Sequence, residues 1–307
     1  MAKGLIVCFA LALVVGVAWA LRPVRTSGPV TPSEAWLAAE RHARRVTAVA
    51  WCLLVPVPLL ALLLVTPYLQ ALAVGALTAA LPLLAGTAFV AVHVVGEVTW
   101  PRPAGAVRRA PLVRRRLADL APRALSVLTG AWTLLLVLLL VVCGAAAGTG
   151  GRSLSYAHAD GTTSTASPFP GWYYGRLVVG ALVVLLVGCL AALVLVARRA
   201  AVADTDPVDD VALRRTSARR VLSGVQLVVG ATLAGCLFFA ANVVRVVEPR
   251  WADALGAGSA ETVAAVAAVI AIGIGVTALV VAVRGARATL RPASAHVEQT
   301  PAAQAAA

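Results

Sequence analysis

Seven apolar stretches, each about long enough for a helix to cross a lipid bilayer, constrain this chain more than any other feature of its sequence. A hydrocarbon core of about 30 Å requires about 20 apolar residues in a helix. The stretches cover residues 4–21, 46–65, 71–95, 124–144, 176–197, 221–244 and 262–283. Only residues 66–70 separate the second stretch from the third, so these two are expected to form an antiparallel hairpin. The sequence therefore predicts an all-α membrane protein, built as a bundle of seven transmembrane helices.

The composition agrees with lipid as the solvent. Of the 307 residues, 61% are hydrophobic and 13% are charged, and the mean hydropathy is +0.91. A soluble domain usually has about 45–50% apolar and about 25% charged residues. We therefore place residues 1–292 in a single transmembrane domain of a multi-pass protein of the cell membrane. Residues 293–307 are rich in Ala, Gln and Thr, and we expect them to form a disordered cytoplasmic tail.

The arginines predict how the bundle is oriented. The chain has a net charge of +13, and the stretch from Gly96 to Arg116 alone carries six arginines and one acid. If all seven helices are retained and the N-terminus is outside, 21 of the 25 arginines fall in four cytoplasmic segments. These segments are residues 22–45, 96–123, 198–220 and 284–307. Because Lys and Arg accumulate on the cytoplasmic side, we expect the N-terminus outside and the C-terminus in the cytoplasm.

Five arginines in the loop after the third helix are expected to attract anionic lipid head groups, at about 1 kcal/mol per residue near the surface. They are Arg108, Arg109, Arg114, Arg115 and Arg116. Nucleic acid is not expected as a partner, because the arginines lie between apolar segments rather than on one face of a soluble module. The bilayer and its anionic head groups are the partners that the sequence predicts, and it identifies no protein partner.

The first apolar stretch has a second interpretation. Lys3, the apolar residues after it and Ala18-Trp19-Ala20 resemble a secretory signal peptide with its cleavage site. Cleavage would leave six helices and would put the arginine-rich residues 96–123 outside the cell. The arginine distribution favours seven retained helices, whereas a mature N-terminus at Leu21 would favour the signal peptide.

Two segments 175 positions apart resemble each other. Residues 31–34 (TPSE) precede residues 43–46 (ARRV), and residues 206–209 (DPVD) precede residues 218–221 (ARRV) at the same spacing. Each pattern predicts a capped cytoplasmic helix that enters a membrane span. One interpretation is a repeat of two parallel three-helix halves, as in some transporters. The other, which we favour, is convergence, because any helix that enters a membrane from the cytoplasm benefits from a cap and arginines.

The longest segment expected outside the cell covers residues 148–175. It contains a turn signal at Asp160-Gly161. It ends with Trp172, Tyr173 and Tyr174 at the start of the fifth predicted span. We interpret these three as membrane-interface aromatics, which gather where helices leave the bilayer. A platform for an extracellular solute is the alternative.

Two short strings carry a resemblance to other proteins. Residues 97–103 (EVTWPRP) and 166–175 (ASPFPGWYYG) resemble strings in a group of uncharacterised polytopic membrane proteins of high-GC actinobacteria. The arrangement of apolar stretches is similar over most of the chain. The resemblance implies a membrane location, and it implies no catalytic activity.

His93 and Glu97 are the candidate functional polar pair. His93 is the only ionisable side chain well within a predicted span, and Glu97 follows at its cytoplasmic edge. At this spacing both lie on one helix face, about 5–6 Å apart. Such a pair can carry protons or bind a cation, although zinc needs at least three protein ligands, so no metal is predicted. The alternatives are a His–Glu hydrogen bond at a helix end, or Glu97 paired with Arg102 or another loop arginine.

The sixth predicted span carries further polar and small residues. Gln226 and Asn242 are candidate intramembrane polar contacts, which form hydrogen bonds between helices at about 0.6 kcal/mol each. Contact with a solute is the alternative. Small residues at four-residue spacing, Gly230 with Ala234 and Ala231 with Gly235, predict faces on which helices approach closely.

No recognised catalytic motif is present in the sequence, which lacks G-x-S-x-G, H-E-x-x-H and Walker A strings. We therefore predict no catalytic residues, no cofactor and no enzymatic activity. The main hypothesis is a non-enzymatic scaffold or accessory component with arginine-rich cytoplasmic loops. The alternative is a small-solute transporter built from two parallel three-helix halves joined by a linker helix. A solid bundle around His93 would favour the first hypothesis, and a solvated polar cavity would favour the second.

Overall fold

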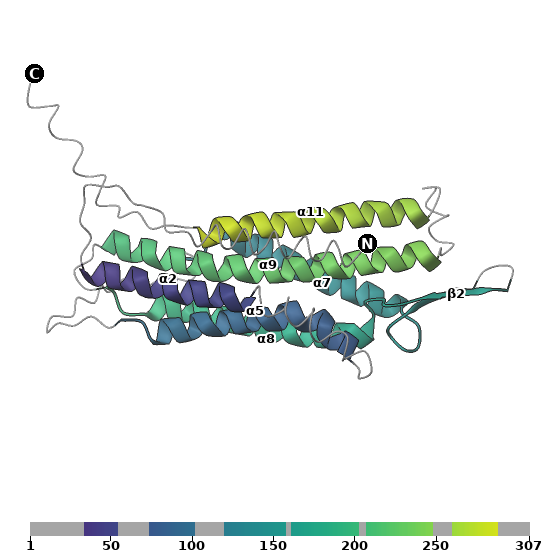
Figure 1. The fold of residues 1–307 in the computed structure, drawn as a ribbon, viewed down its shortest axis with the longest axis horizontal. Coiled ribbons are helices and arrows are strands. Elements are labelled where there is room, and N and C mark those ends of the chain that lie inside the picture. Colours follow the sequence, from purple (N-terminus) through teal and green to yellow (C-terminus); the bar gives the residue numbers. More distant parts are fainter. Residues whose placement is uncertain are drawn as a thin grey trace, which may run out of the picture.

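The computed structural model describes residues 34–54, 74–101, 120–157, 161–202, 207–247 and 260–287. The helices in these segments are α2 (Glu34–Leu54), α5 (Val74–Val98), α7 (Arg123–Ala146), α8 (Trp172–Arg198), α9 (Pro207–Val247) and α11 (Ala260–Ala286). The strands are β1 (Leu154–Ala157) and β2 (Thr163–Ala166). The helices lie side by side, and the two strands project from one end of the bundle (Figure 1).

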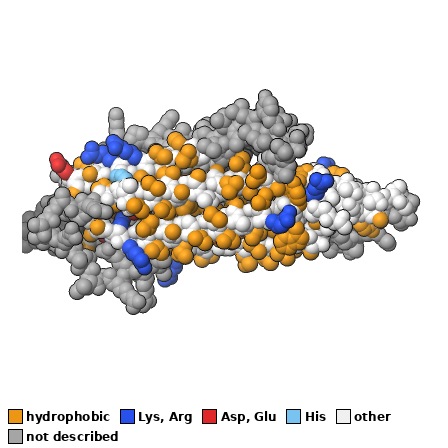
Figure 2. Space-filling view, turned by 90° about the horizontal axis from the view of Figure 1, so that it is seen from below, with side chains coloured by type: hydrophobic (Ala, Val, Ile, Leu, Met, Phe, Trp, Pro, Cys, Tyr) orange, Lys and Arg blue, Asp and Glu red, His pale blue; other side chains and the backbone are white. Residues whose placement is uncertain are grey.

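Five of the helices in the described segments, all except α2, are long and apolar enough to cross a membrane. Hydrophobic side chains cover the middle of the bundle, and arginine side chains lie toward its two ends (Figure 2). The protein is therefore a mostly helical, multi-pass membrane protein, as the sequence predicts. The first predicted span, most of the second, the connection at 66–70 and the tail at 293–307 lie outside the described residues. The count of seven and the orientation stay predictions.

Helix α9 is much longer than its predicted span of residues 221–244. The predicted cytoplasmic helix and the span form one continuous helix of 41 residues that begins at Pro207. No Gly or Pro interrupts the chain between Val208 and Ser223, so nothing in this part ends the helix. Asp209 and Asp210 in its first turn suit the positive end of the helix dipole. The arginines between positions 214 and 220 consequently lie on a continuous helix rather than on a loop.

The β-hairpin between α7 and α8 is an element that the sequence does not predict. Strands β1 and β2 pair antiparallel, with Leu154 opposite Ala166 and Ala157 opposite Thr163. Gly161 between them has a φ of +83°, in the left-handed region that favours glycine, which fits the predicted turn. Each strand has only four residues. A segment so short gives too little alternation of apolar and polar residues for a strand to be recognised.

Helix α9 packs against α5, α7, α8 and α11. At Gly230 the approach is so close that an added Cβ atom would overlap the Trp132 ring of α7 and would touch Ala278 of α11. An added Cβ at Gly235 would meet nothing within 4 Å. The spacing predicts two close-packing faces on α9, one with Gly230 and one with Gly235. Only Gly230 lies in close contact with neighbouring helices.

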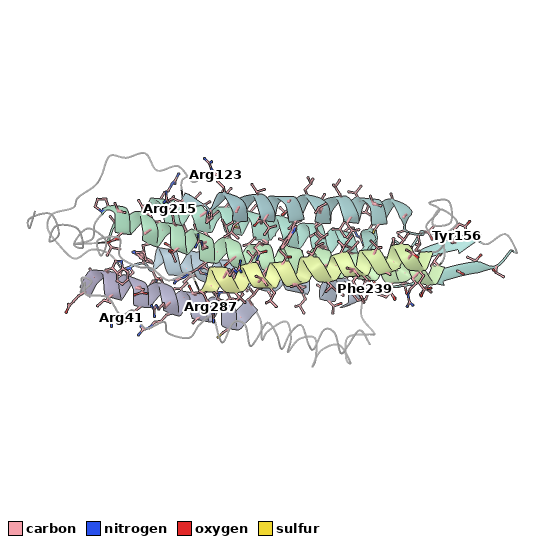
Figure 3. All side chains as sticks on the ribbon, turned by 90° about the horizontal axis from the view of Figure 1, so that it is seen from above. Arg41, Arg123, Tyr156, Arg215, Phe239 and Arg287 are labelled. Atoms are coloured by element: carbon pink, nitrogen blue, oxygen red, sulfur yellow. The ribbon has the colours of Figure 1, made fainter. Side chains whose placement is uncertain are left out.

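One end of the bundle collects the arginines. The labelled Arg41, Arg123 and Arg215 lie toward this end, whereas Tyr156 and Phe239 lie toward the other (Figure 3). The first half of α2, the last turns of α5 and α8, and the first turns of α7 and α9 meet here, as the contacts between their residues show. We call it the arginine-rich end, and it is the end that the sequence predicts to be cytoplasmic.

Candidate functional site

His93 lies at the inner edge of the arginine-rich end, within the packed core. Its side chain is buried, and its ring meets the Phe89 ring edge-on, with the centroids 4.7 Å apart. Phe89 in turn meets Trp51 of α2, at 5.3 Å. His93 Nε2 forms no hydrogen bond with any of the residues that the structure describes. The imidazole is therefore held by packing, chiefly against the Phe89 ring.

A small cavity is bordered by both His93 and Glu97. Its volume is about 10 Å³, and the residues around it come from α2, α5 and α9 and include Trp100, which follows α5. A cavity needs about 10–15 Å³ to hold one water molecule, so this space admits one water at most. The two residues of the predicted pair thus line the same cavity, but this cavity is too small for a solute to pass.

The Glu97 carboxylate forms an ion pair with Arg199, the residue directly after α8. Arg199 Nη1 lies 3.4 Å from Glu97 Oε1 and 3.3 Å from Oε2, and it also donates to Ser217 Oγ at 3.2 Å. The side chains of Arg199 and Glu97 are only 2% and 8% exposed. Burial lowers the pKa of the Arg199 guanidinium, and the adjacent Glu97 carboxylate opposes this shift. The ion pair joins the ends of α5 and α8.

Trp100 completes the surroundings of Arg199. The guanidinium carbon of Arg199 lies 3.9 Å from the centroid of the Trp100 ring, in a cation–π contact. His42 of α2 meets the same ring edge-on, and its Nε2 lies 2.9 Å from the Gly96 carbonyl oxygen. Since a carbonyl oxygen only accepts, His42 Nε2 is the donor. Helix α2 is thereby fixed to the end of α5.

Arg214 closes the end of α8. Its side chain is fully buried. Nη1 donates to the carbonyls of Val196 and Ala197 at 2.8 and 3.1 Å, Nη2 donates to the carbonyl of Arg199 at 2.9 Å, and Nε donates to Asp210 Oδ2 at 2.8 Å. The last carbonyls of a helix lack partners within it. Arg214 supplies these partners while Asp210 balances its charge.

These side chains form one unit, which we call the closed polar cluster: His42, His93, Glu97, Trp100, Arg199, Asp210 and Arg214. Its charges are paired with each other, and its members come from α2, α5 and α9 and from the residues directly after α5 and α8. Among the residues that the structure describes, no group of three or more His, Cys, Asp or Glu side chains gathers in a way that can hold a metal ion. The chemistry that the cluster supports is hydrogen bonding and ion pairing between helix ends.

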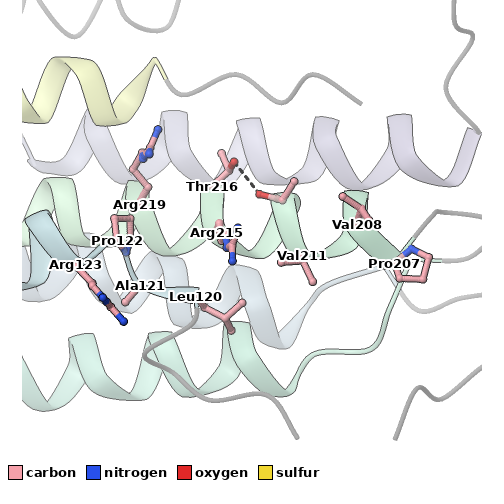
Figure 4. A pocket seen from close by; sticks show the side chains of 11 residues that line it. Leu120, Ala121, Pro122, Arg123, Pro207, Val208, Val211, Arg215, Thr216 and Arg219 are labelled. Carbon is pink, nitrogen blue, oxygen red and sulfur yellow. Dashed lines mark hydrogen bonds between the residues drawn. The ribbon is translucent and has the colours of Figure 1, made fainter. Parts of the chain in front are cut away.

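A second hollow at the same end has the opposite character. It has a volume of about 920 Å³ and lies between residues 120–123, where α7 begins, and the face of α9 from Pro207 to Arg219. Three exposed arginines, Arg123, Arg215 and Arg219, border it (Figure 4). No carboxylate is among the described residues that line it. We call this hollow the open groove.

The other predicted site residues are spread over the molecule. Gln226 is fully buried, and its Nε2 donates to the Ala278 carbonyl of α11 at 2.9 Å. Asn242 is exposed, and it accepts a hydrogen bond from Arg245 within α9. Neither residue lies in the closed polar cluster or in the open groove.

The predicted interface aromatics begin α8 at the end opposite the arginine-rich end. Trp172 is the first residue of the helix, and its ring lies against Gly144 of α7. The rings of Tyr173 and Tyr174 meet edge-on, with the centroids 5.0 Å apart. The helix therefore starts four residues earlier than predicted, and the three aromatics form its first turn.

The five arginines predicted to contact lipid, at positions 108, 109 and 114–116, lie outside the described residues. The alternative in which Glu97 pairs with a loop arginine is the one that the structure shows, with Arg199 as the partner. Sequence reasoning did not identify Arg199 or Arg214 individually, and it gave no sign that His42 approaches this site. The spacing of Asp210 and Arg214 is a recognisable i, i+4 ion pair. Nothing in the sequence, however, indicates that this pair reaches the end of α8.

Comparison with known proteins gives no further assignment: no family model, no curated protein and no solved structure matches the chain.

Proposed function

We propose that this chain is a non-enzymatic scaffold or accessory component of the cell membrane, acting through its arginine-rich cytoplasmic side. The observation that carries the proposal is the closed polar cluster. The predicted functional pair, His93 and Glu97, faces a space of about 10 Å³, and Glu97 is held by Arg199. These contacts favour a fixed arrangement of helix ends over the solvated path that a transporter needs.

The rigid cytoplasmic side is suited to present arginines to a partner. Arg214 ties α9 to α8, Arg199 ties α8 to α5, and His42 ties α2 to α5. The first three turns of α9 are therefore anchored although they precede the membrane span. Residues 102–119, which connect α5 with α7, add six arginines and one aspartate. We infer that an acidic partner docks on this side.

The test compares assemblies extracted from native membranes. In one variant the arginines at 108, 109 and 114–116 become Gln, and in a matched control they become Lys. Lys keeps the cytoplasmic charge that orients the loop, and a reporter fused after Arg116 checks that orientation in both. The wild type is expected to migrate on a native gel in an assembly larger than its own 31.3 kDa. The Gln variant is expected to lose it. A wild type that migrates alone, or a Gln variant with an unchanged assembly, would contradict the proposal.

A further inference from the structure

The open groove exists because two helices begin at different levels. Helix α9 starts at Pro207, whereas α7 starts at Arg123, several turns further along α9. In Figure 4, Pro122, Arg123 and Arg219 lie toward one end of the groove, and Pro207 lies at the other end. One face of the first turns of α9 is therefore left without a helix against it, in the part of the chain that the structure describes.

The floor of the groove is apolar. Leu120, Val208 and Val211 contribute aliphatic side chains, and Pro122 and Pro207 add ring carbons. Thr216 adds no free hydroxyl donor, because its Oγ1 donates to the Ala212 carbonyl at 3.0 Å (Figure 4). A floor of this kind accommodates hydrocarbon, and it offers little to a ligand that is polar throughout.

The rim of the groove is cationic. Arg215 and Arg219 are one turn apart on α9, which puts them on the same helix face, and Arg123 borders the groove at the start of α7. Guanidinium groups bind phosphate through paired, charge-assisted hydrogen bonds. An anionic head group above an apolar floor is therefore the complement of this groove.

The surface beside the groove continues into the hydrocarbon region. Val127 lies one turn after Arg123 on α7, and it is 70% exposed. Helix α7 continues from there with exposed leucines and valines at 134, 135, 138, 141 and 142. An acyl chain can follow this face while its phosphate stays at the arginines. A soluble phosphate compound would leave both the apolar floor and this continuation unused.

Charge argues against the neighbouring loop as the occupant. Residues 102–119 carry six arginines and one aspartate, so their charge has the same sign as the rim. We infer that the open groove binds the head group of an anionic phospholipid, with Arg123, Arg215 and Arg219 around its phosphate. Apart from the geometry of the groove, the inference requires only that the protein lies in a membrane. It does not depend on the proposed scaffold function and goes beyond it.

The experiment measures lipid binding to the purified full-length protein in a neutral detergent by native mass spectrometry. The probe is dioleoyl phosphatidylglycerol, and dioleoyl phosphatidylcholine is the zwitterionic comparison. The groove variant is Arg215→Gln with Arg219→Gln. The matched control is Arg41→Gln with Arg45→Gln, because these arginines are also exposed, one turn apart, and at the same end on α2.

For the wild type we expect tighter binding of the first phosphatidylglycerol than of phosphatidylcholine. The groove variant should bind phosphatidylglycerol about tenfold or more weakly, whereas the control should stay within about threefold of the wild type. Free glycerol phosphate should not displace the lipid. Equal losses in the two variants, equal affinity for the two lipids, or displacement by glycerol phosphate would overturn the inference.

A second variant, Val211→Trp, fills the floor and keeps every arginine. It should also lose phosphatidylglycerol, and unchanged binding would show that the floor is no part of the site. Melting temperatures establish that each variant is folded. Since the native assembly is tested with residues 108–116 and the lipid with residues 211–219, either proposal can fail while the other stands.

Discussion

Arg214 and Arg215 are neighbours in α9 and have opposite surroundings. Arg214 is fully buried, and its guanidinium meets three backbone carbonyls and a carboxylate. Arg215 is exposed and borders the open groove. The closed polar cluster and the open groove thus lie on two faces of the same helix. The arginines of this chain therefore have two structural roles, which are holding helix ends together and presenting charge at the surface.

The largest expected difference between the two faces concerns stability. Arg214→Met leaves Asp210 and the carbonyls at the end of α8 buried without their partner. Removing one member of a buried pair costs about 3–5 kcal/mol. Arg215→Met should change the free energy of unfolding by no more than about 0.5 kcal/mol, as is usual for exposed positions. Unfolding in mixed micelles, followed by circular dichroism, measures both. Equal losses would mean that the two arginines do not differ as the structure indicates.

A double-mutant cycle sharpens the comparison at the level of pairs. Glu97→Gln and Arg199→Met should each cost about 2–3 kcal/mol, and their coupling free energy should be about 0.5–3 kcal/mol. The control cycle uses Glu40 and Arg44, whose Nη2–Oε1 distance is 2.6 Å but whose arginine is 41% exposed. Its coupling should not exceed about 0.5 kcal/mol. A stronger coupling in the control pair would show that burial does not decide the outcome.

The middle of α9 extends the comparison from charge to packing. Gly230→Ala forces a methyl group against Trp132, and such overpacking costs about 1–3 kcal/mol. Gly235→Ala meets nothing within 4 Å, and in a helix the change from Gly to Ala alone is favourable by up to about 1 kcal/mol. The two variants should shift the melting temperature in detergent in opposite directions. If both variants shifted the melting temperature in the same direction, Gly230 and Gly235 would not differ in packing as the structure indicates.

The smallest expected effect is at Gln226. Its amide donates to the Ala278 carbonyl across the contact between α9 and α11. Polar contacts between membrane helices contribute about 0.6 kcal/mol on average. Gln226→Leu should therefore lower the free energy of unfolding by about this amount in the same micelle assay. A loss above about 3 kcal/mol would indicate that Gln226 belongs to a larger polar network than the described contacts.

The membrane character of the fold follows from the sequence because it depends on local properties. Runs of about 20 apolar residues identify five of the described helices to within a few residues at most ends. Two deviations have local causes: α9 continues because no Gly or Pro stops it, and α8 begins at Trp172 directly after Pro170-Gly171. The strands of the hairpin are too short to leave a recognisable pattern.

The site was harder to predict because it is made of contacts between distant residues. The spacing of His93 and Glu97 indicated a shared helix face, and both residues do border one cavity. The residues that contact this part of α5 are distant along the chain. His42, which bonds to Gly96, is 54 positions away, and Arg199, which bonds to Glu97, is 102 positions away. Such partners depend on how the helices are arranged, and apolar periodicity alone does not determine that arrangement. The open groove likewise results from the different starting levels of α7 and α9.

The most direct test of the closed cluster beside an open groove is thiol accessibility. In a full-length protein whose five native cysteines are replaced by Ala, single cysteines are placed at His93 or at Arg215. A membrane-impermeant cationic thiol reagent is then added to open membrane vesicles, which expose both surfaces. Rapid modification is expected for Arg215→Cys, and no modification is expected for His93→Cys until the protein is unfolded. Modification of His93→Cys at a comparable rate in the folded protein would contradict this expectation, and would instead indicate the solvated path of a transporter.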